Sequence, residues 1–491
     1  MTERVFFSRP VQAVFLVATL GGLFSLAPTP LNRLSLFVAP PGGTRPKAED
    51  AAALDASAER LGEAELAADS KTLPGMAAPD GTTPTPTTPA LFGGRAAQPL
   101  EPIATTAPPL PLLDPTGHSL DHFFAALSKT QRKQPGAITR IAHFGDSVIV
   151  SDYVSGTLRR KFQENFGDAG HGYMLIANPW PAYFHNDVFR FATKGFRVSR
   201  IVGPLTEDGW YGLGGVTFRG SAGVVAQFGT AEKGSFGKNV SRFVLSYLES
   251  PGGGVLKLYV DGELREEVDT KGPEKRMARH EIRMADGSHR LEMRLGGAET
   301  RTFGIVLERE GPGVVLDALG VQGARIRFLD KQDDAHFADE LRWRRPDLVV
   351  YQFGANESGD GYAYPMDEYL TTMKAVIAQS QAALPEASCM IVGAMDRARV
   401  EEGVTTSMKI ITLIVAEQKK AAQERGCAYF DTYESMGGWG SMPVWVKRGL
   451  GQADMTHPTG VGAERLAGWI YGALMQRYAA YLKETSVQRA P

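Results

Sequence analysis

Cysteine is scarce in this sequence. Of the 491 residues only Cys389 and Cys427 are cysteines, and neither shows the spacing of a metal-binding motif. Each stands at the start of an expected strand, where cysteine is commonly buried as a small apolar side chain. We therefore expect two free thiols in the core. A disulfide is the alternative if the protein is exported and the two strands are neighbours.

An excess of charge of one sign is also missing. Lysine and arginine together number 53, and aspartate and glutamate 55. The chain therefore has no strong net field to attract nucleic acid or an anionic surface. The sequence contains nothing that resembles a phosphate-cradling glycine loop or a metal site. We expect no nucleic-acid partner, no metal and no cofactor.

One long apolar run lies near the N-terminus. The segment "VQAVFLVATLGGLFSLAPTP" follows Arg4 and Arg9, and its length of about 17 mainly apolar residues falls between a signal-peptide core and a short membrane span. The sequence matches a signal-peptide cleavage site poorly, because Ala27 is followed directly by Pro28. We expect residues 1–30 to anchor the protein in a membrane, with a removed signal peptide as the alternative. Both imply export to a periplasmic or other extracytoplasmic location.

Residues 31–115 are rich in proline, alanine and threonine, as in "DGTTPTPTTPALFGG". Such a composition cannot bury enough apolar surface to offset the entropy of ordering the chain. Its prolines also favour extended conformations. We interpret this segment as a disordered tether between the membrane and a folded body.

Strands that alternate with helices are expected in residues 116–185 and again in 314–485. The strands are mostly continuous apolar runs, which is typical of a parallel sheet covered by helices on both faces. Helices are expected between them, for example "SDYVSGTLRRKFQENFG" and "AERLAGWIYGALMQRYAAYL". The expected strands are "ITRIAHFG", "VVLDALGV", "DLVVYQFG", "SCMIVGAM" and "CAYFDTY".

In residues 186–313 apolar and polar residues alternate with a period of two, which is typical of antiparallel strands. The sequence "VLKLYVDGELREEV" predicts a hairpin around Asp261-Gly262, and "HEIRMADGSHRLEMRL" predicts a second around Asp286-Gly287. No long helix is expected in this segment. We expect an all-β insertion, a sandwich, inside the α/β domain.

Polar side chains with catalytic potential follow the expected parallel strands. Gly145-Asp146-Ser147 and Asn356 each come directly after an apolar strand, and Asp454 and His457 stand three residues apart before the last helix. Serine, histidine and aspartate are the ingredients of acyl transfer, in which histidine takes the hydroxyl proton and aspartate orients the imidazole. Gly323 follows another strand and can offer a backbone N–H to an oxyanion.

This set of motifs resembles the SGNH or GDSL hydrolases, which are named after such Ser, Gly, Asn and His positions. The resemblance covers residues 138–185 and 314–480. It implies that Ser147 is the nucleophile, His457 the general base and Asp454 its orienting partner. It also implies an oxyanion hole, for which we expect the N–H groups of Ser147 and Gly323 and the side chain of Asn356. Rival glycines for the Gly323 position occur in "GWYGLGGVTFRG", namely Gly212, Gly214 and Gly215.

Two features of the resemblance suggest a subgroup. The family's usual Gly-x-Asn-Asp is here Gly-Ala-Asn-Glu, with Glu357 in the last place, and the β insertion separates the nucleophile from Gly323. Together with "FGDAGHGY" these features resemble the bacterial peptidoglycan O-acetylesterases, whose insertion is similar to a carbohydrate-binding module. Candidate substrate contacts are Asp146, His171 and Glu357, whereas we expect His143 to be a core residue.

The resemblance implies a serine esterase that removes small acyl groups, foremost acetyl, from a cell-envelope polysaccharide such as peptidoglycan. One alternative keeps the same residues but passes the acyl group to a sugar hydroxyl, which would make the protein an O-acetyltransferase. Another is a cell-wall-binding protein in which the sandwich binds and the α/β domain is inactive. The intact serine, aspartate and histidine set argues against this last reading.

Overall fold

The computed structural model describes residues 100, 103 and 107–487. The chain divides into two units, 1–95 and 96–491, and the description below concerns the second. The expected membrane segment, residues 1–30, and most of the expected linker, residues 31–115, lie outside the described residues. Among the helices that are described, none is both long and apolar enough to cross a bilayer.

A five-stranded parallel sheet forms one part of the molecule, in the order β13-β1-β14-β15-β18. All five expected parallel strands are confirmed. Because β1 lies between β13 and β14, the loops that follow these three strands are neighbours at the carboxyl edge of the sheet. The strands are β1 (Ile138–Gly145), β13 (Gly313–Gly320), β14 (Leu348–Gln352), β15 (Ser388–Val392) and β18 (Ala428–Phe430).

The side chains of these strands are buried on both faces of the sheet, which explains their continuous apolar runs. Leu348 and Val350 belong to one cluster of buried residues, whereas Val349 and Tyr351 belong to the other. Such alternation follows from the pleat, because successive side chains point to opposite faces.

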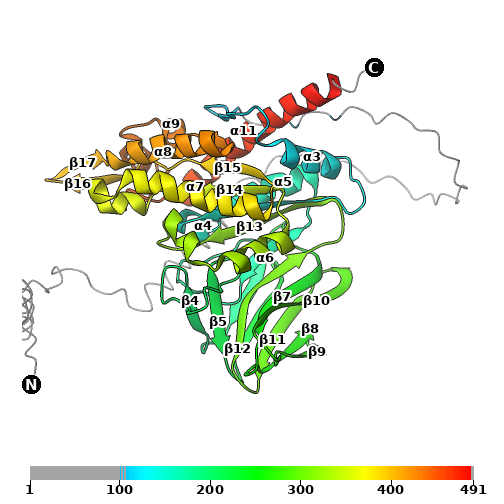
Figure 1. Ribbon diagram of the computed structural model, residues 1–491. Helices are drawn as coiled ribbons and strands as arrows, with labels where there is room; N and C mark the ends of the chain where they lie inside the picture. The colour runs from blue at the N-terminus through cyan, green and yellow to red at the C-terminus, as the bar shows by residue number, and fades with distance from the viewer. Residues whose placement is uncertain (1–99, 101–102, 104–106, 488–491) are drawn as a thin grey trace, which may run out of the picture. The chain divides into compact units, whose positions relative to one another are not determined.

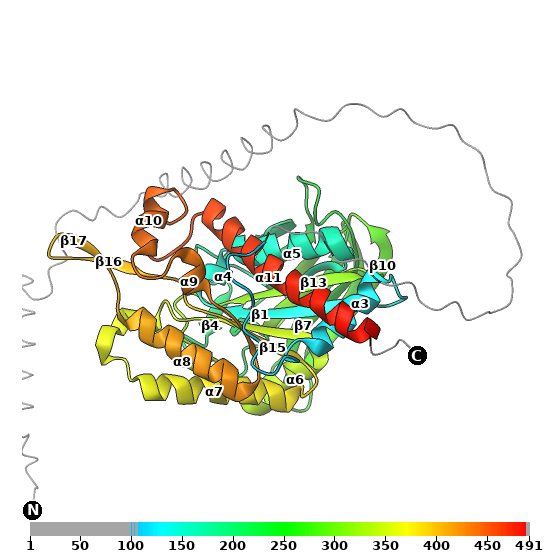
Figure 2. The same cartoon turned by 90° about the horizontal axis from the view of Figure 1, so that it is seen from above.

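Helices cover each face of this sheet, as Figure 2 shows from above. Apolar side chains of α3, α5 and α11 join one cluster, and those of α6, α7 and α8 join the other. The helices are α3 (Asp121–Gln131), α5 (Tyr153–Phe166), α6 (Asp334–Arg344), α7 (Met366–Ala383), α8 (Ile410–Arg425) and α11 (Gly460–Val487). Shorter ones are α4 (Ser147–Val150), α9 (Thr432–Met436), α10 (Ser441–Lys447), η3 (Ile326–Lys331) and η4 (Glu357–Ala363).

Two larger antiparallel sheets, which we call the β body, lie outside the parallel sheet (Figure 1). A separate two-stranded sheet pairs β16 (Ala398–Glu401) with β17 (Val404–Ser407). One sheet of the β body has the order β10-β7-β12-β5-β4, with β2 also paired to β12, and the other β3-β6-β11-β8-β9. Buried residues of both sheets belong to one cluster, as expected for a sandwich. The strands are β2 (Gly170–Leu175), β3 (Val188–Ala192), β4 (Arg197–Arg200), β5 (Val216–Gly220), β6 (Val225–Thr230), β7 (Val240–Glu249), β8 (Val255–Val260), β9 (Glu263–Asp269), β10 (Arg276–Gly287), β11 (Arg290–Gly296) and β12 (Thr300–Glu308).

The two expected hairpins have different outcomes. Strands β8 and β9 pair antiparallel around Asp261-Gly262, so the first hairpin is confirmed. The second is wrong, because β10 pairs with β7 while β11 pairs with β6 and β8. The chain crosses from one sheet to the other after Asp286-Gly287. A turn sequence and a period of two are common to hairpins and to such crossings, so the sequence could not distinguish them.

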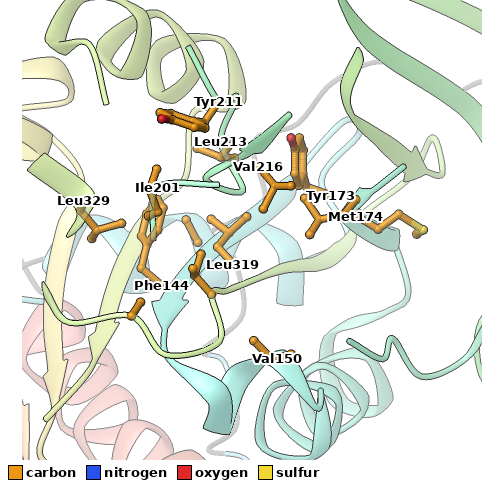
Figure 3. Packing of buried hydrophobic residues seen from close by; sticks show 14 of the residues in the cluster. Phe144, Val150, Tyr173, Met174, Ile201, Tyr211, Leu213, Val216, Leu319 and Leu329 are labelled. Carbon is orange, nitrogen blue, oxygen red and sulfur yellow. The ribbon is translucent and has the colours of Figure 1, made fainter. Parts of the chain in front are cut away.

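The β body and the parallel sheet share one core. Strand β2 lies before the expected start of the insertion at residue 186, yet it pairs with β12. Tyr173 and Met174 of β2 lie in the same buried cluster as Phe144 of β1 and Leu319 of β13 (Figure 3). The β body is therefore not a separate module on a flexible link.

The two cysteines form a disulfide, so the expectation of free thiols is wrong. Strands β15 and β18 are parallel neighbours, and Met390 is the register partner of Ala428. The residues just before this pair, Cys389 and Cys427, are thereby placed with their Cα atoms 4.6 Å apart. That distance permits a disulfide. The sequence did not reveal which strands are neighbours.

Candidate active site

The carboxyl edge of the parallel sheet brings the predicted site residues together. Gly145, at the end of β1, is the register partner of Gly320 in β13 and of Gln352 in β14. The segments that carry Ser147, Gly323 and Asn356 therefore leave the sheet side by side.

Two glycines allow α4 to lie directly on the strand ends. A Cβ on Gly145 would lie 2.4 Å from Cγ1 of Ile149, and one on Gly320 would lie 2.4 Å from the backbone nitrogen of Val150. Only glycine permits such a close approach without displacement. Helix α4, which begins at Ser147, therefore packs directly against the ends of β1 and β13.

Ser147, His457 and Asp454 form a hydrogen-bonded chain. Ser147 Oγ lies 2.7 Å from His457 Nε2, and His457 Nδ1 lies 2.6 Å from Asp454 Oδ2. Because a carboxylate only accepts, Nδ1 carries the proton and Nε2 is left to accept the serine hydroxyl. The structure brings these three predicted residues together in the geometry that activates a serine nucleophile.

The loop around Asp454 fixes this carboxylate. Its Oδ1 accepts the backbone N–H groups of Thr456, at 2.9 Å, and of His457, at 3.0 Å. Burial alone would raise the pKa of Asp454, but the hydrogen bonds from His457 and Thr456 outweigh it and lower the pKa below its ordinary value. The carboxylate therefore stays charged while it orients the imidazole.

The expected oxyanion-hole residues lie on the two loops beside Ser147. Gly323 has a φ of 77° and stands just after β13, and Asn356 precedes η4 with its Nδ2 2.8 Å from the carbonyl oxygen of Ala324. An amide nitrogen has two N–H groups, so one remains beyond this contact. Of the rival glycines, Gly212 donates its N–H to His336 Nε2 and Gly215 donates to the carbonyl of Gly212. These two N–H groups are thus already used within the fold.

The three candidate substrate contacts, Asp146, His171 and Glu357, are buried, and their contact with substrate stays a prediction. Asp146 is 2% exposed and its Oδ1 accepts the N–H of Val148 at 3.0 Å, which caps α4. Burial raises the pKa of Asp146 to about 6. Glu357 is fully buried and its Oε1 accepts the N–H of Ile326 at 2.8 Å.

His171 lies in strand β2, and its Nε2 is 2.5 Å from the carbonyl oxygen of Asp187. Gly170 and Gly172, on either side of His171, permit the close packing of β2 against its neighbours. His143 is a buried core residue, as expected. Its Nε2 lies 3.0 Å from Gln352 Oε1, and burial lowers its pKa to about 4.

Arg397 is a residue of the site that the sequence analysis missed. Its Nε donates to Thr456 Oγ1 at 3.0 Å, and its Nη1 donates to the Ala355 carbonyl at 2.7 Å and to Ser358 Oγ at 2.9 Å. It thereby links the loop of Asn356 to the loop of Asp454 and His457. Its position after the end of β15, at the same edge of the sheet, was the signal that could have identified it.

We compared the chain with family models, with curated proteins and with solved structures. Residues 288–465 match the model of the GDSL-like Lipase/Acylhydrolase family. This range holds Gly323, Asn356, Asp454 and His457, while the segment with Ser147 precedes it. No curated protein matches the chain.

Solved structures with a similar fold include a peptidoglycan O-acetylesterase. It has 21% sequence identity and a TM-score of 0.64, and the match covers 75% of this chain and 99% of that one. At this identity the likeness shows a shared fold. Two further matches are weaker. A family two carbohydrate esterase from Cellvibrio japonicus has 12% identity, a TM-score of 0.25 and coverages of 60% and 98%. An acetylxylan esterase from Geobacillus stearothermophilus has 17% identity, a TM-score of 0.25 and coverages of 34% and 73%.

The predicted resemblance to the SGNH or GDSL hydrolases is confirmed by the family model and by the shared fold. The match over residues 288–465 and the shared fold support an esterase.

Proposed function

We propose that the protein is a serine esterase that removes O-acetyl groups from a cell-envelope polysaccharide such as peptidoglycan. The observation that carries the proposal is the hydrogen-bonded chain from Ser147 Oγ through His457 to Asp454. In this proposal Ser147 is the nucleophile, His457 the general base and acid, and Asp454 the group that orients the imidazole.

The reaction has two acyl-transfer steps. Ser147 Oγ attacks the ester carbonyl carbon while His457 Nε2 takes its proton, and the oxyanion accepts hydrogen bonds from the N–H groups of Ser147 and Gly323 and from Asn356. The carbon–oxygen bond to the sugar then breaks, and His457 returns the proton to the sugar oxygen. Water attacks the acetyl-enzyme with His457 again as base, which releases acetate and restores Ser147.

The substrate class rests on the shared fold. The similar solved structure is that of a peptidoglycan O-acetylesterase, and the match spans almost all of that chain. The match covers 75% of this chain, which is more than its α/β part alone comprises. We propose that the β body holds the polymer beside Ser147, so that binding remote from the ester positions the reacting group. A polymer in the cell envelope also requires export, which we propose is directed by residues 1–30.

The test is product analysis with purified protein. Acetylated peptidoglycan should release free acetate at a rate that Ser147→Ala lowers by about a thousandfold or more. The same reaction should be run with a free acceptor sugar and analysed by mass spectrometry. Acetyl groups that appear on the acceptor in place of free acetate would contradict hydrolysis and show a transferase. The Ser147→Ala protein should still co-sediment with the insoluble polymer, and loss of co-sedimentation on deacetylated and acetylated polymer alike would contradict the binding role of the β body.

A further inference from the structure

Two consecutive side chains, Asn356 and Glu357, bind the same short segment after β13. Asn356 Nδ2 donates to the carbonyl of Ala324 at 2.8 Å, and Glu357 Oε1 accepts the N–H of Ile326 at 2.8 Å. The segment that they hold starts directly after Gly323. The loops after β13 and β14 are thus joined by two hydrogen bonds whose anchor points on the chain lie two residues apart.

Glu357 makes its bond in a fully buried position. Its side chain is 0% exposed, and among the described residues its second oxygen, Oε2, has no hydrogen-bond partner. Burying a carboxyl group is costly, and burial accordingly raises the pKa of Glu357 to about 7. The hydrogen bond from the N–H of Ile326, a fully buried residue, partly offsets this cost.

We propose that Glu357 is a positioning residue for the oxyanion hole, which sets the place of Gly323 relative to Asn356. Asn356 alone fixes only one point of the segment. The second bond, at Ile326, prevents the segment from pivoting about Ala324 and so fixes the direction of the Gly323 N–H. This inference rests on the proposed function, in which Gly323 and Asn356 bind the oxyanion formed on attack by Ser147.

The length of the side chain matters more than its charge in this role. Aspartate, the residue usual at this position in the resembled family, is shorter by one methylene and would withdraw its oxygen from the Ile326 N–H. Glutamine keeps both the length and a carbonyl oxygen that accepts this N–H, although it cannot ionise. The proposal therefore predicts that Glu357→Gln is the milder change and Glu357→Asp the more harmful one.

Steady-state kinetics of the full chain on a small soluble acetate ester, such as p-nitrophenyl acetate, tests whether Glu357→Asp is more harmful than Glu357→Gln. Glu357→Gln should keep kcat within about threefold, whereas Glu357→Asp and Glu357→Met should lower kcat by about ten- to a hundredfold with KM nearly unchanged. A displacement on the order of 1 Å at a reacting centre has effects of this size. With the rate referred to the folded fraction measured by circular dichroism, a loss confined to kcat indicates a contact needed in the transition state.

Glu340 supplies the matched control. It is also fully buried, and its Oε2 accepts the backbone N–H of Leu213 at 3.1 Å, away from the proposed oxyanion hole. Glu340→Met therefore removes a bond of the same kind, and with it the ion pair of Oε1 with Arg279 at 2.5 Å. Because neither contact involves the loops of Gly323 and Asn356, kcat should remain within about threefold in the folded fraction. If Glu357→Met does not fold, the comparison of Glu357→Gln with Glu357→Asp still tests the positioning role of Glu357.

Three results would overturn the proposal. Glu357→Asp could have a higher kcat than Glu357→Gln, or the Glu357 variants could raise KM instead of lowering kcat. Glu340→Met could also lower kcat as much as Glu357→Met does. Ser147→Ala, assayed in parallel, separates this from the proposed function. If Ser147→Ala is inactive and Glu357→Asp is fully active, the positioning role alone fails. If Ser147→Ala remains active, the proposed function fails as well.

Discussion

Asp454 holds His457 at two points. Its Oδ1 accepts the backbone N–H of His457 at 3.0 Å, and its Oδ2 lies 2.6 Å from Nδ1 of the ring. One carboxylate therefore sets both the position of the backbone and the orientation of the imidazole. Because the two residues are only three apart in sequence, a single short loop supplies two members of the proposed triad.

Asp454→Asn tests this double contact. An amide nitrogen that faces Nδ1 would favour the tautomer with the proton on Nε2, which cannot accept the Ser147 hydroxyl proton. We expect kcat to fall by roughly a thousandfold or more while the fold is kept, since tautomer loss has effects of this order. Steady-state kinetics and circular dichroism would check it. A decrease of less than tenfold would show that Asp454 does not determine the tautomer.

Arg397 should be needed for its three hydrogen bonds rather than for its charge. Arg397→Lys keeps the positive charge but cannot bond Thr456, Ala355 and Ser358 in the same geometry. We expect both Arg397→Lys and Arg397→Met to lower kcat by about tenfold or more, since both release the loop of Asn356 from the loop of His457. Full activity in Arg397→Lys with loss in Arg397→Met would show that only the charge matters.

Glu357 should make the stability of the protein depend on pH. Burial, and secondarily the charge of Asp146, raises its pKa in the folded state to about 7 from an ordinary value of 4.5. Its contribution is therefore complete below pH 4.5 and is lost as the pH rises through about 7. Glutamine does not titrate, so Glu357→Gln should gain stability relative to wild type between pH 5 and pH 8, by up to roughly 3 kcal/mol.

Urea unfolding at both pH values would measure this difference. Glu310→Gln, at an exposed glutamate, is the control and should show no such change. An identical pH dependence for wild type and Glu357→Gln would mean that the buried carboxyl does not hold its proton.

Removal of residues 186–313, which hold every strand of the β body except β2, should destabilise the α/β part. Tyr173 of β2 and Leu319 of β13 lie in one buried cluster with residues of the β body, and β2 would lose its partner β12. Replacement of residues 186–313 by a short glycine and serine link should therefore give aggregated or unfolded protein, as judged by gel filtration and circular dichroism. A soluble protein with normal activity on a small ester would show that the shared core is dispensable.

Much of the α/β part could be predicted because its signals are local. Continuous apolar strands, helices of period 3.6 and polar residues at strand ends led to Ser147, Asn356, Asp454 and His457. The errors concern relations between segments distant in the sequence. The disulfide of Cys389 and Cys427 depends on which strands are neighbours, and the burial of Glu357 depends on a loop some thirty residues away, at Ile326. Neither relation is visible in local periodicity.

The most direct test of the account compares Ser147→Ala, His457→Ala and the double variant on a soluble acetate ester. Ser147 Oγ and His457 Nε2 are 2.7 Å apart, and we propose that they act as one unit. Each single variant should lose about a thousandfold or more in kcat, and the double variant should lose little beyond the worse single one. A Ser147→Ala protein that keeps a substantial fraction of wild-type activity, or losses that multiply in the double variant, would contradict the account.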